Sequence, residues 1–235
     1  MSDMLFHLAL AVIPTILAIT LHEAAHGYAA LALGDDTARA AGRLSLNPIR
    51  HIDRMGTIIL PGFLLISQLL VAGRIFFMFG WAKPVPVAAW KFPNPRRGMA
   101  IVACAGPAMN FFLAWLGALA MPERLSPGGA ETAYVEFLTY FMLSNVVLGL
   151  FNLLPVPPLD GGRIAVGLLP ESMARAWARL ERAGILIVLL VVFLLPHLIG
   201  FDPVGEALER VLPWAFRTLF WLSGHDVGAA DGHVI

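Results

Sequence analysis

Long apolar runs constrain the fold of this chain more than any other feature of its sequence. Four of them cover residues 4–33, 98–121, 134–154 and 183–200. A helix needs about 20 mostly apolar residues to cross the hydrocarbon core of a bilayer. With 58% hydrophobic and only 14% charged residues, the chain also exceeds what a soluble domain needs for its core. We therefore predict an all-α polytopic membrane protein, a bundle of helices solvated largely by lipid.

Two further segments are less regular. Residues 56–79 are long enough to span, but prolines, glycines and a charge interrupt them. Residues 204–222 mix acidic and basic side chains with tryptophan and phenylalanine, which is typical of a helix at the membrane surface. The expected fold has about five to six transmembrane or re-entrant helices in one integral membrane domain over 1–235, with its core at 4–163 and C-terminal helices at 171–222.

The first apolar run carries three ionisable side chains within five residues, His22-Glu23-Ala24-Ala25-His26. At 3.6 residues per turn, positions i and i+4 of a helix face the same side, so two imidazoles can bind one zinc ion with the glutamate beside it. An ionisable side chain at mid-bilayer costs about 2.5 kcal/mol or more unless it is paired or ligated. The cluster therefore predicts a metal site with His22 and His26 as ligands and Glu23 as general base.

A catalytic zinc site usually has three protein ligands and one open position, so a third ligand is required. Asp160 follows a helix that prolines break, and it precedes Gly161 and Gly162, which let the backbone approach closely. An Asp-Gly pair by itself is usually a turn. In a chain that needs an oxygen ligand at membrane depth, Asp160 is the best candidate.

A shared metal also constrains the topology. If His22 and Asp160 bind one ion, the helix that carries His22 and the helix that precedes Asp160 run in the same direction. The two later spans form an antiparallel hairpin, so residues 34–97 must begin and end on one side of the membrane. Residues 56–79 are then a re-entrant hairpin or cross an even number of times, because a single crossing would separate the ligands.

The basic residues indicate the orientation. Of the 16 Lys and Arg residues, nine lie in 34–97 and four in 155–182, two segments that this topology places on one side. Cytoplasmic loops are enriched in Lys and Arg, so we expect the metal site near the cytoplasmic side and the N-terminus outside. The net charge of zero and the lack of a basic stripe with interleaved aromatics give no indication of nucleic-acid binding.

Together these patterns resemble the site-2 protease family of intramembrane zinc metalloproteases, in a compact bacterial form without a PDZ or CBS domain. The stretches that carry the resemblance are His22 to His26, Arg43 to Asp53, Gly80 to Val87, Ala105 to Asn110 and Asn152 to Gly162. It implies that His22, His26 and Asp160 hold one zinc ion and that Glu23 activates water. It further implies that Asn152 positions the substrate or stabilises the oxyanion, and that the chain lies in the bacterial inner membrane.

Three amides in the apolar runs have competing interpretations. Asn152 offers a donor that could stabilise a developing oxyanion, but a hydrogen bond between neighbouring spans explains it equally well. For Asn110 and Asn145, helix packing is the favoured interpretation.

Two loop regions have competing interpretations as well. At residues 80–87, Pro84 and Pro86 forbid a helix, so this stretch is either a short membrane-associated β segment whose edge binds an extended substrate or a rigid connector. His51 and Asp53 form either a second polar cluster near the metal or, as we favour, a turn or helix cap.

The expected function is that of an intramembrane zinc endopeptidase that hydrolyses peptide bonds of transmembrane or membrane-adjacent substrates. Its partners would be a membrane protein with a transmembrane helix and the lipid bilayer. The substrate must unwind locally, because a helix hides its carbonyl groups from attack. The alternative is a non-catalytic metal-binding membrane scaffold or a cation transporter. Transporters often contain paired repeats, and the sequence shows broken helices but no repeat.

Overall fold

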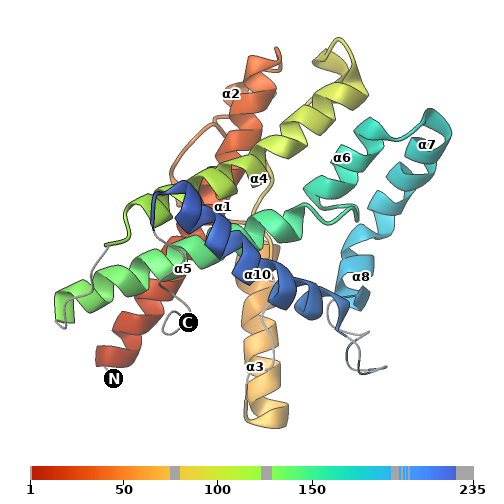
Figure 1. The fold of residues 1–235 in the computed structure, drawn as a ribbon. Helices are drawn as coiled ribbons and strands as arrows, with labels where there is room; N and C mark the ends of the chain where they lie inside the picture. Colours follow the sequence, from red (N-terminus) through yellow and green to blue (C-terminus); the bar gives the residue numbers. More distant parts are fainter. Residues whose placement is uncertain are drawn as a thin grey trace.

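The computed structural model describes residues 2–74, 80–122, 129–191 and 202–225, together with Pro196, Leu198 and Gly200. Within these residues every regular element is helical (Figure 1). The α-helices are α1 (Ser2–Ala32), α2 (Thr37–Ala40), α3 (Leu60–Ala72), α4 (Pro95–Leu119), α5 (Gly129–Asn152), α6 (Asp160–Leu168), α7 (Glu171–Arg179), α8 (Gly184–Leu189) and α10 (Pro203–Leu222). Shorter helical turns are η1 (Pro48–His51), η2 (Arg54–Ile59), η3 (Ala89–Lys91) and η4 (Leu180–Ala183).

Three helices of the described chain are long and apolar enough to cross a membrane: Leu5–Ala32 in α1, Pro95–Leu119 in α4 and Thr132–Asn152 in α5. The prediction of a largely helical membrane protein is confirmed at this level. The expected number of five to six membrane helices is not confirmed. Part of the predicted helix at 183–200 is α8, and residues 192–195, 197 and 199 lie outside the described residues.

The ends of the first two spans follow local sequence signals. The chain turns at Gly34, where φ is +98°, a conformation that glycine adopts without strain, and this confirms the predicted end of the first helix. The second span begins at Pro95, three residues before the predicted start. Asn94 caps it by accepting a hydrogen bond from the Arg97 N–H at 3.1 Å. An Asn-Pro pair is a standard helix start, and the apolar pattern alone begins too late to show it.

Helix α4 is central, since it packs against α1, α5 and α6. Close approach depends on small residues: a Cβ atom added to Gly117 would lie 2.7 Å from Cγ of Met142 on α5. Helix α10, which the sequence predicts at the membrane surface, covers α4 and α5 (Figure 1). The buried cluster that joins these three helices comprises Ala114, Ala118, Met142, Val146, Ala215 and Leu219.

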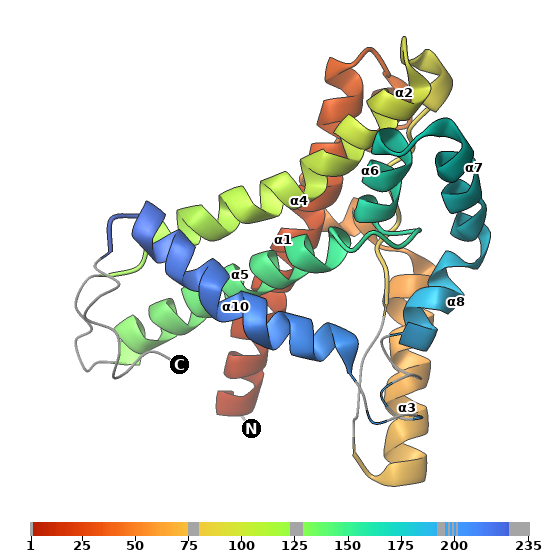
Figure 2. The same ribbon diagram turned by 45° about the vertical axis from the view of Figure 1, so that its right-hand side comes forward.

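The segment between α1 and α4 begins and ends at one end of the bundle. Ala30 of α1 packs against Phe92 and Val102 near the start of α4. Within this segment the Trp81 N–H donates to the Gly56 carbonyl at 3.1 Å. Gly56 lies just before α3, so the chain that follows α3 returns to the start of that helix. Helix α3 projects away from the other helices in both views (Figure 1, Figure 2). This path agrees with the expected return of the segment to one side.

The predicted β segment at 80–87 is not confirmed. Residues 80–88 are not helical and pair with no strand among the described residues. A ladder requires a second strand to accept the main-chain N–H groups, and here carbonyls of the helical turns η1 and η2 and two carboxylate side chains accept them instead. The donors and acceptors are Trp81 to Gly56 O (3.1 Å), Lys83 to His51 O (2.8 Å), Val85 to Glu23 Oε2 (3.0 Å) and Ala88 to Asp35 Oδ2 (2.6 Å).

Candidate metal centre

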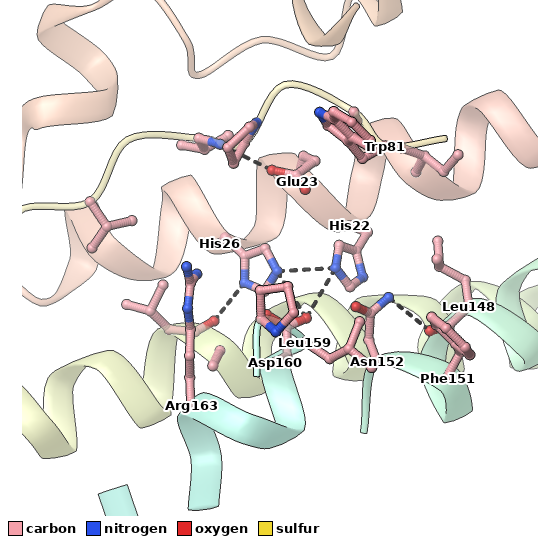
Figure 3. A pocket seen from close by; sticks show the side chains of 18 of the residues that line it. His22, Glu23, His26, Trp81, Leu148, Phe151, Asn152, Leu159, Asp160 and Arg163 are labelled. Carbon is pink, nitrogen blue, oxygen red and sulfur yellow. Dashed lines mark hydrogen bonds and ion pairs between the residues drawn. The ribbon is translucent and has the colours of Figure 1, made fainter. Parts of the chain in front are cut away.

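Three side chains from two distant parts of the chain meet at one point. The Nε2 atoms of His22 and His26 lie 3.1 Å apart, and Oδ2 of Asp160 lies 3.2 Å from the first and 3.3 Å from the second (Figure 3). Around a tetrahedral zinc ion with bonds of about 2.0–2.1 Å, neighbouring ligand atoms are separated by about 3.3 Å. The three atoms therefore already have the spacing that one zinc ion requires.

The surroundings of these atoms also fit a metal ion. Oδ2 of Asp160 is buried without a hydrogen-bond partner, although it lies within ion-pair distance of both imidazoles, and leaving a buried acceptor unsatisfied is costly. A Cβ atom added to Gly106 of α4 would lie 2.5 Å from both Cε1 of His22 and Nε2 of His26. Only glycine leaves this space open. Two imidazole nitrogens and a carboxylate oxygen are donors that zinc accepts.

Helix α6 fixes Asp160, which is its first residue. A Cβ atom on Gly161 would collide with the Leu153 carbonyl oxygen, so the glycine allows α6 to begin directly against the end of α5, as the sequence predicts. At the far end of α6, the Arg96 guanidinium donates to the carbonyl oxygens of Val166 (2.9 Å) and Leu169 (2.5 Å). The helix is therefore held at both ends.

The charge of Asp160 suits a metal ligand. Burial raises the pKa of its carboxyl, but the adjacent imidazoles of His22 and His26 outweigh burial and lower that pKa to about 2. Metal ligands must be deprotonated, so the carboxylate is in its binding form at neutral pH.

A chain of amides sets the protonation of His22. The His22 Nδ1–H donates to Oδ1 of Asn110 at 2.6 Å, and Nδ2 of Asn110 donates to Oδ1 of Asn145 at 2.9 Å and to the Ala18 carbonyl at 3.3 Å. Nδ2 of Asn145 donates to the Phe141 carbonyl at 2.8 Å. These acceptors fix both amide orientations, so Nδ1 of His22 carries the proton and Nε2 presents its lone pair to the site.

His26 is oriented by the main chain. Its Nδ1–H donates to the Val102 carbonyl of α4 at 2.7 Å, so its Nε2 is also available as a ligand. The sequence predicts helix packing for Asn110 and Asn145, and the hydrogen bond between them joins α4 to α5. The sequence does not predict the additional contact of Asn110 with His22, and a main-chain carbonyl such as that of Val102 has no sequence signal.

The three side chains open onto a pocket of about 360 Å³, within the usual size range of ligand sites. Glu23 lines the same pocket, and its carboxylate points toward residues 80–88 while the imidazoles point toward α4 and α6 (Figure 3). Arg163 also lines it and pairs with Glu181 at 3.1 Å. The pocket therefore combines the candidate ligands, the predicted base and an extended backbone segment.

Asn152 lines this pocket at the end of α5. Its Nδ2 donates to the Leu148 carbonyl of the same helix at 3.0 Å, which is not the hydrogen bond between spans that the packing interpretation predicts. A primary amide carries two N–H groups, so the second can still donate into the pocket.

His51 and Asp53 have structural roles. Oδ1 of Asp53 accepts the Gly56 N–H at 2.7 Å as the N-cap of η2, and Nε2 of His51 donates to the Ser45 carbonyl at 2.8 Å. The cap and turn interpretation is confirmed. In the described part of the chain, neither residue belongs to the group of side chains that could hold a metal.

Comparisons with known proteins give the family. Residues 117–195 match the model of peptidase family M50, a range that includes Asn152 and Asp160. A candidate zinc metalloprotease of Bacillus subtilis, YwhC, is 41% identical over 79% of this chain and 80% of its own length. Rip2 of Mycobacterium tuberculosis, which is also described as a candidate zinc metalloprotease, is 31% identical over 88% of this chain and 70% of its own length. No solved structure matches. The chain belongs to peptidase family M50, the site-2 protease family of membrane zinc metalloproteases.

Proposed function

We propose that this protein is an intramembrane zinc endopeptidase that hydrolyses peptide bonds of transmembrane or membrane-adjacent substrates with activated water. The observation that carries the proposal is the triangle formed by His22, His26 and Asp160 in the pocket that Glu23 also lines. Family membership supports the metal and the reaction class, and the three apolar helices support a site at the membrane.

His22, His26 and Asp160 would hold one zinc ion per chain. When bound, zinc polarises the scissile carbonyl and lowers the pKa of a coordinated water from 15.7 toward about 7. The chain orients the two histidine ligands in advance, because Asn110 and the Val102 carbonyl accept hydrogen bonds from their Nδ1 atoms. Each Nε2 is then the ring nitrogen that faces the site.

Glu23 would move the proton. It neighbours His22 on α1 and lines the pocket, so its carboxylate can accept a proton from the attacking water and deliver it to the leaving amine. The second amide N–H of Asn152 would donate to the oxyanion. Removing one such donor typically costs about 3 kcal/mol of transition-state stabilisation.

Residues 80–88 would bind the unwound substrate. In an extended chain the N–H and C=O of alternate residues point to the same side. Trp81, Lys83 and Val85 direct their N–H groups into the protein, so Ala82, Pro84 and Pro86 would face the other side. Proline has no N–H, and this edge therefore offers carbonyl oxygens almost exclusively. We expect it to bind the N–H groups of an extended substrate.

The remaining architecture is proposed on hydropathy and charge. One integral membrane domain over 1–235, with its core at 4–163 and C-terminal helices at 171–222, would place five to six helices in a bacterial inner membrane. The concentration of Lys and Arg in 34–97 and 155–182 supports a metal site near the cytoplasmic side and an external N-terminus.

Substituting Glu23 by glutamine tests the mechanism. Glu23→Gln removes the base and leaves the ligands, so purified protein should keep about one zinc per chain and lose cleavage, which metal analysis and a comparison of membrane proteomes can measure. A membrane protein that accumulates uncut only with Glu23→Gln would identify a substrate. An active Glu23→Gln variant would contradict the mechanism. Zinc-independent ion flux in liposomes would instead favour a transporter.

A further inference from the structure

A fully buried carboxylate lies outside the metal site, just beyond the end of α1. Asp35 has no exposed surface. Its Oδ1 accepts the Thr37 N–H at 3.0 Å and the Thr37 hydroxyl at 2.5 Å, its Oδ2 accepts the Ala88 N–H at 2.6 Å, and Nζ of Lys91 lies 3.3 Å from Oδ1. Both oxygens of Asp35 are thus acceptors, and one of them holds the extended segment 80–88.

The same segment meets α1 at a second carboxylate. Three residues before Ala88, the Val85 N–H donates to Oε2 of Glu23 at 3.0 Å (Figure 3). The Val85 side chain is buried, and it packs so closely on α1 that a Cβ atom on Gly27 would lie 3.1 Å from its Cγ1. Residues 80–88 are therefore attached at two carboxylates, Asp35 just beyond the end of α1 and Glu23 on α1 in the pocket.

We propose that the main-chain N–H of Val85 positions the general base, and that Asp35 is the positioning residue that keeps this N–H in place. The inference rests on the proposed function, in which Glu23 is the base. A glutamate side chain loses considerable rotamer freedom when it is ordered. A donor that holds Oε2 supplies that order, because it restricts the carboxylate to one place in the pocket, and a base must lie within hydrogen-bond reach of the proton that it removes.

Asp35 fixes residues 80–88 independently of Glu23, so that the Val85 N–H can hold the Glu23 carboxylate in place. The other described main-chain N–H bonds of the segment, from Trp81 and Lys83, go to the helical turns η2 and η1. Without the bond between Ala88 and Asp35, only Glu23 itself would tie the N–H groups of residues 80–88 to α1. The position of residues 80–88 would then depend on the Glu23 side chain. In the native arrangement Asp35 fixes this segment, and the segment in turn holds the Glu23 carboxylate.

The first test removes the Val85 N–H. Val85→Pro eliminates the donor next to prolines that already require an extended chain, and Val85→Ala removes most of the side chain but keeps the donor. Val85→Pro loses the hydrogen bond from the Val85 N–H to the charged Glu23 carboxylate, and Val85→Ala keeps it. We therefore expect kcat for a cleaved membrane substrate to be about 10- to 100-fold lower in Val85→Pro than in Val85→Ala. KM should change little, and both variants should bind zinc with the same affinity. Equal kcat values in the two variants would overturn the proposal.

A backbone substitution keeps the test decisive if Val85→Pro fails to fold. Replacing Val85 by its α-hydroxy acid analogue converts the N–H to an ester oxygen and keeps the side chain. The ester variant should show the same loss in kcat, with zinc content and melting temperature close to those of the unmodified protein. Unchanged kcat in a folded, zinc-loaded ester variant would refute the role of this N–H.

The second test concerns Asp35. Asp35→Asn replaces one acceptor oxygen with an N–H donor, so either Thr37 or Ala88 loses its partner, and kcat should fall about tenfold or more with zinc affinity retained. The matched control is Asp36→Asn, because Asp36 also pairs with Lys91 but is 66% exposed. The control should stay within about twofold of the native kcat, the usual size of surface effects. Native kcat in Asp35→Asn would refute the role of Asp35.

These outcomes differ from failure of the proposed function. If the unmodified protein binds no zinc, or if Glu23→Gln cleaves normally, the proposed function itself is wrong. If the unmodified protein cleaves and Glu23→Gln does not, while both the ester variant and Asp35→Asn retain native kcat, only the positioning inference is wrong.

Discussion

Removing the amide of Asn110 should weaken zinc binding although Asn110 is not a ligand. Asn110 has no exposed surface, and its Oδ1 accepts the only described hydrogen bond of the His22 Nδ1 atom, at 2.6 Å. In Asn110→Ala, the His22 ring no longer has the acceptor that fixes its tautomer and rotation. The ring then samples orientations in which Nε2 no longer faces His26 and Asp160.

The size of the effect follows from what an orienting partner contributes to a zinc-binding histidine. Removing such a partner typically weakens metal affinity about 10- to 100-fold, or about 1.4–2.8 kcal/mol. The apoprotein also becomes less stable, because Oδ1 of Asn145 loses the hydrogen bond that Asn110 donates. Each buried group left unsatisfied costs about 1–3 kcal/mol.

Asn110→Asp separates these two effects. Its carboxylate keeps an acceptor for His22, so zinc affinity should remain within a few-fold of the native value, a smaller change than removal of the orienting partner produces. Its second oxygen faces Oδ1 of Asn145, so the fold should still be destabilised. Thr15→Ala is the control for helix packing, because Thr15 bonds Ser144 at 2.9 Å between α1 and α5, the two helices that Asn110 of α4 contacts, without touching a ligand.

The assay is zinc competition against a chromophoric chelator in detergent, with thermal unfolding measured on the same samples. We expect weaker zinc binding in Asn110→Ala, near-native binding in Asn110→Asp and native binding in Thr15→Ala. Native zinc affinity in a folded Asn110→Ala variant would refute the orienting role and return Asn110 to simple packing.

Three further predictions concern Gly106, Arg96 and Asp35. Gly106→Ala places a Cβ atom 2.5 Å from Nε2 of His26, so zinc stoichiometry measured by metal analysis should fall well below one while the helical circular dichroism signal persists; native zinc content would contradict the packing argument. Arg96→Met removes the guanidinium that holds the end of α6, so zinc should dissociate faster in a chelator chase, and an unchanged rate would show that α6 is fixed without it. Burial raises the pKa of the Asp35 carboxyl, but its hydrogen-bond donors outweigh burial and lower that pKa below the ordinary value of 3.8. The stabilisation from Asp35 is therefore complete above the unfolded pKa and disappears as pH falls through the lower folded pKa, so Asp35→Asn should reduce the melting temperature more at pH 7 than at pH 3; an equal reduction at both would refute this linkage.

The sequence predicts the candidate ligands well because their spacing has a direct geometric meaning. His22 and His26 share a helix face by periodicity alone, and Asp160 precedes glycines that permit the close approach seen at Leu153. The extended segment was harder to predict. Pro84 and Pro86 correctly excluded a helix, but whether an extended chain forms a strand depends on a partner strand, and residues far away in the sequence decide that.

Contacts made by main-chain atoms are the part that sequence reasoning could not reach. The Val102 carbonyl orients His26 and the Val85 N–H holds Glu23, yet any residue would supply the same carbonyl and almost any residue the same N–H. The side chains at these two positions report only burial. Such contacts become visible only once the helices are placed.

Helix α4 organises the centre without contributing a ligand. Val102, Gly106 and Asn110 are spaced four residues apart, so they share one helix face, and in order along it they orient His26, leave room beside both imidazoles, and orient His22. Nearer the start of the same helix, Arg96 holds the helix that begins with Asp160. The distance between the two histidines and the aspartate is therefore set by how α1 and α6 pack against a third helix. A change on this face of α4 should act on the metal centre, whereas an equal change on its lipid-facing side should not.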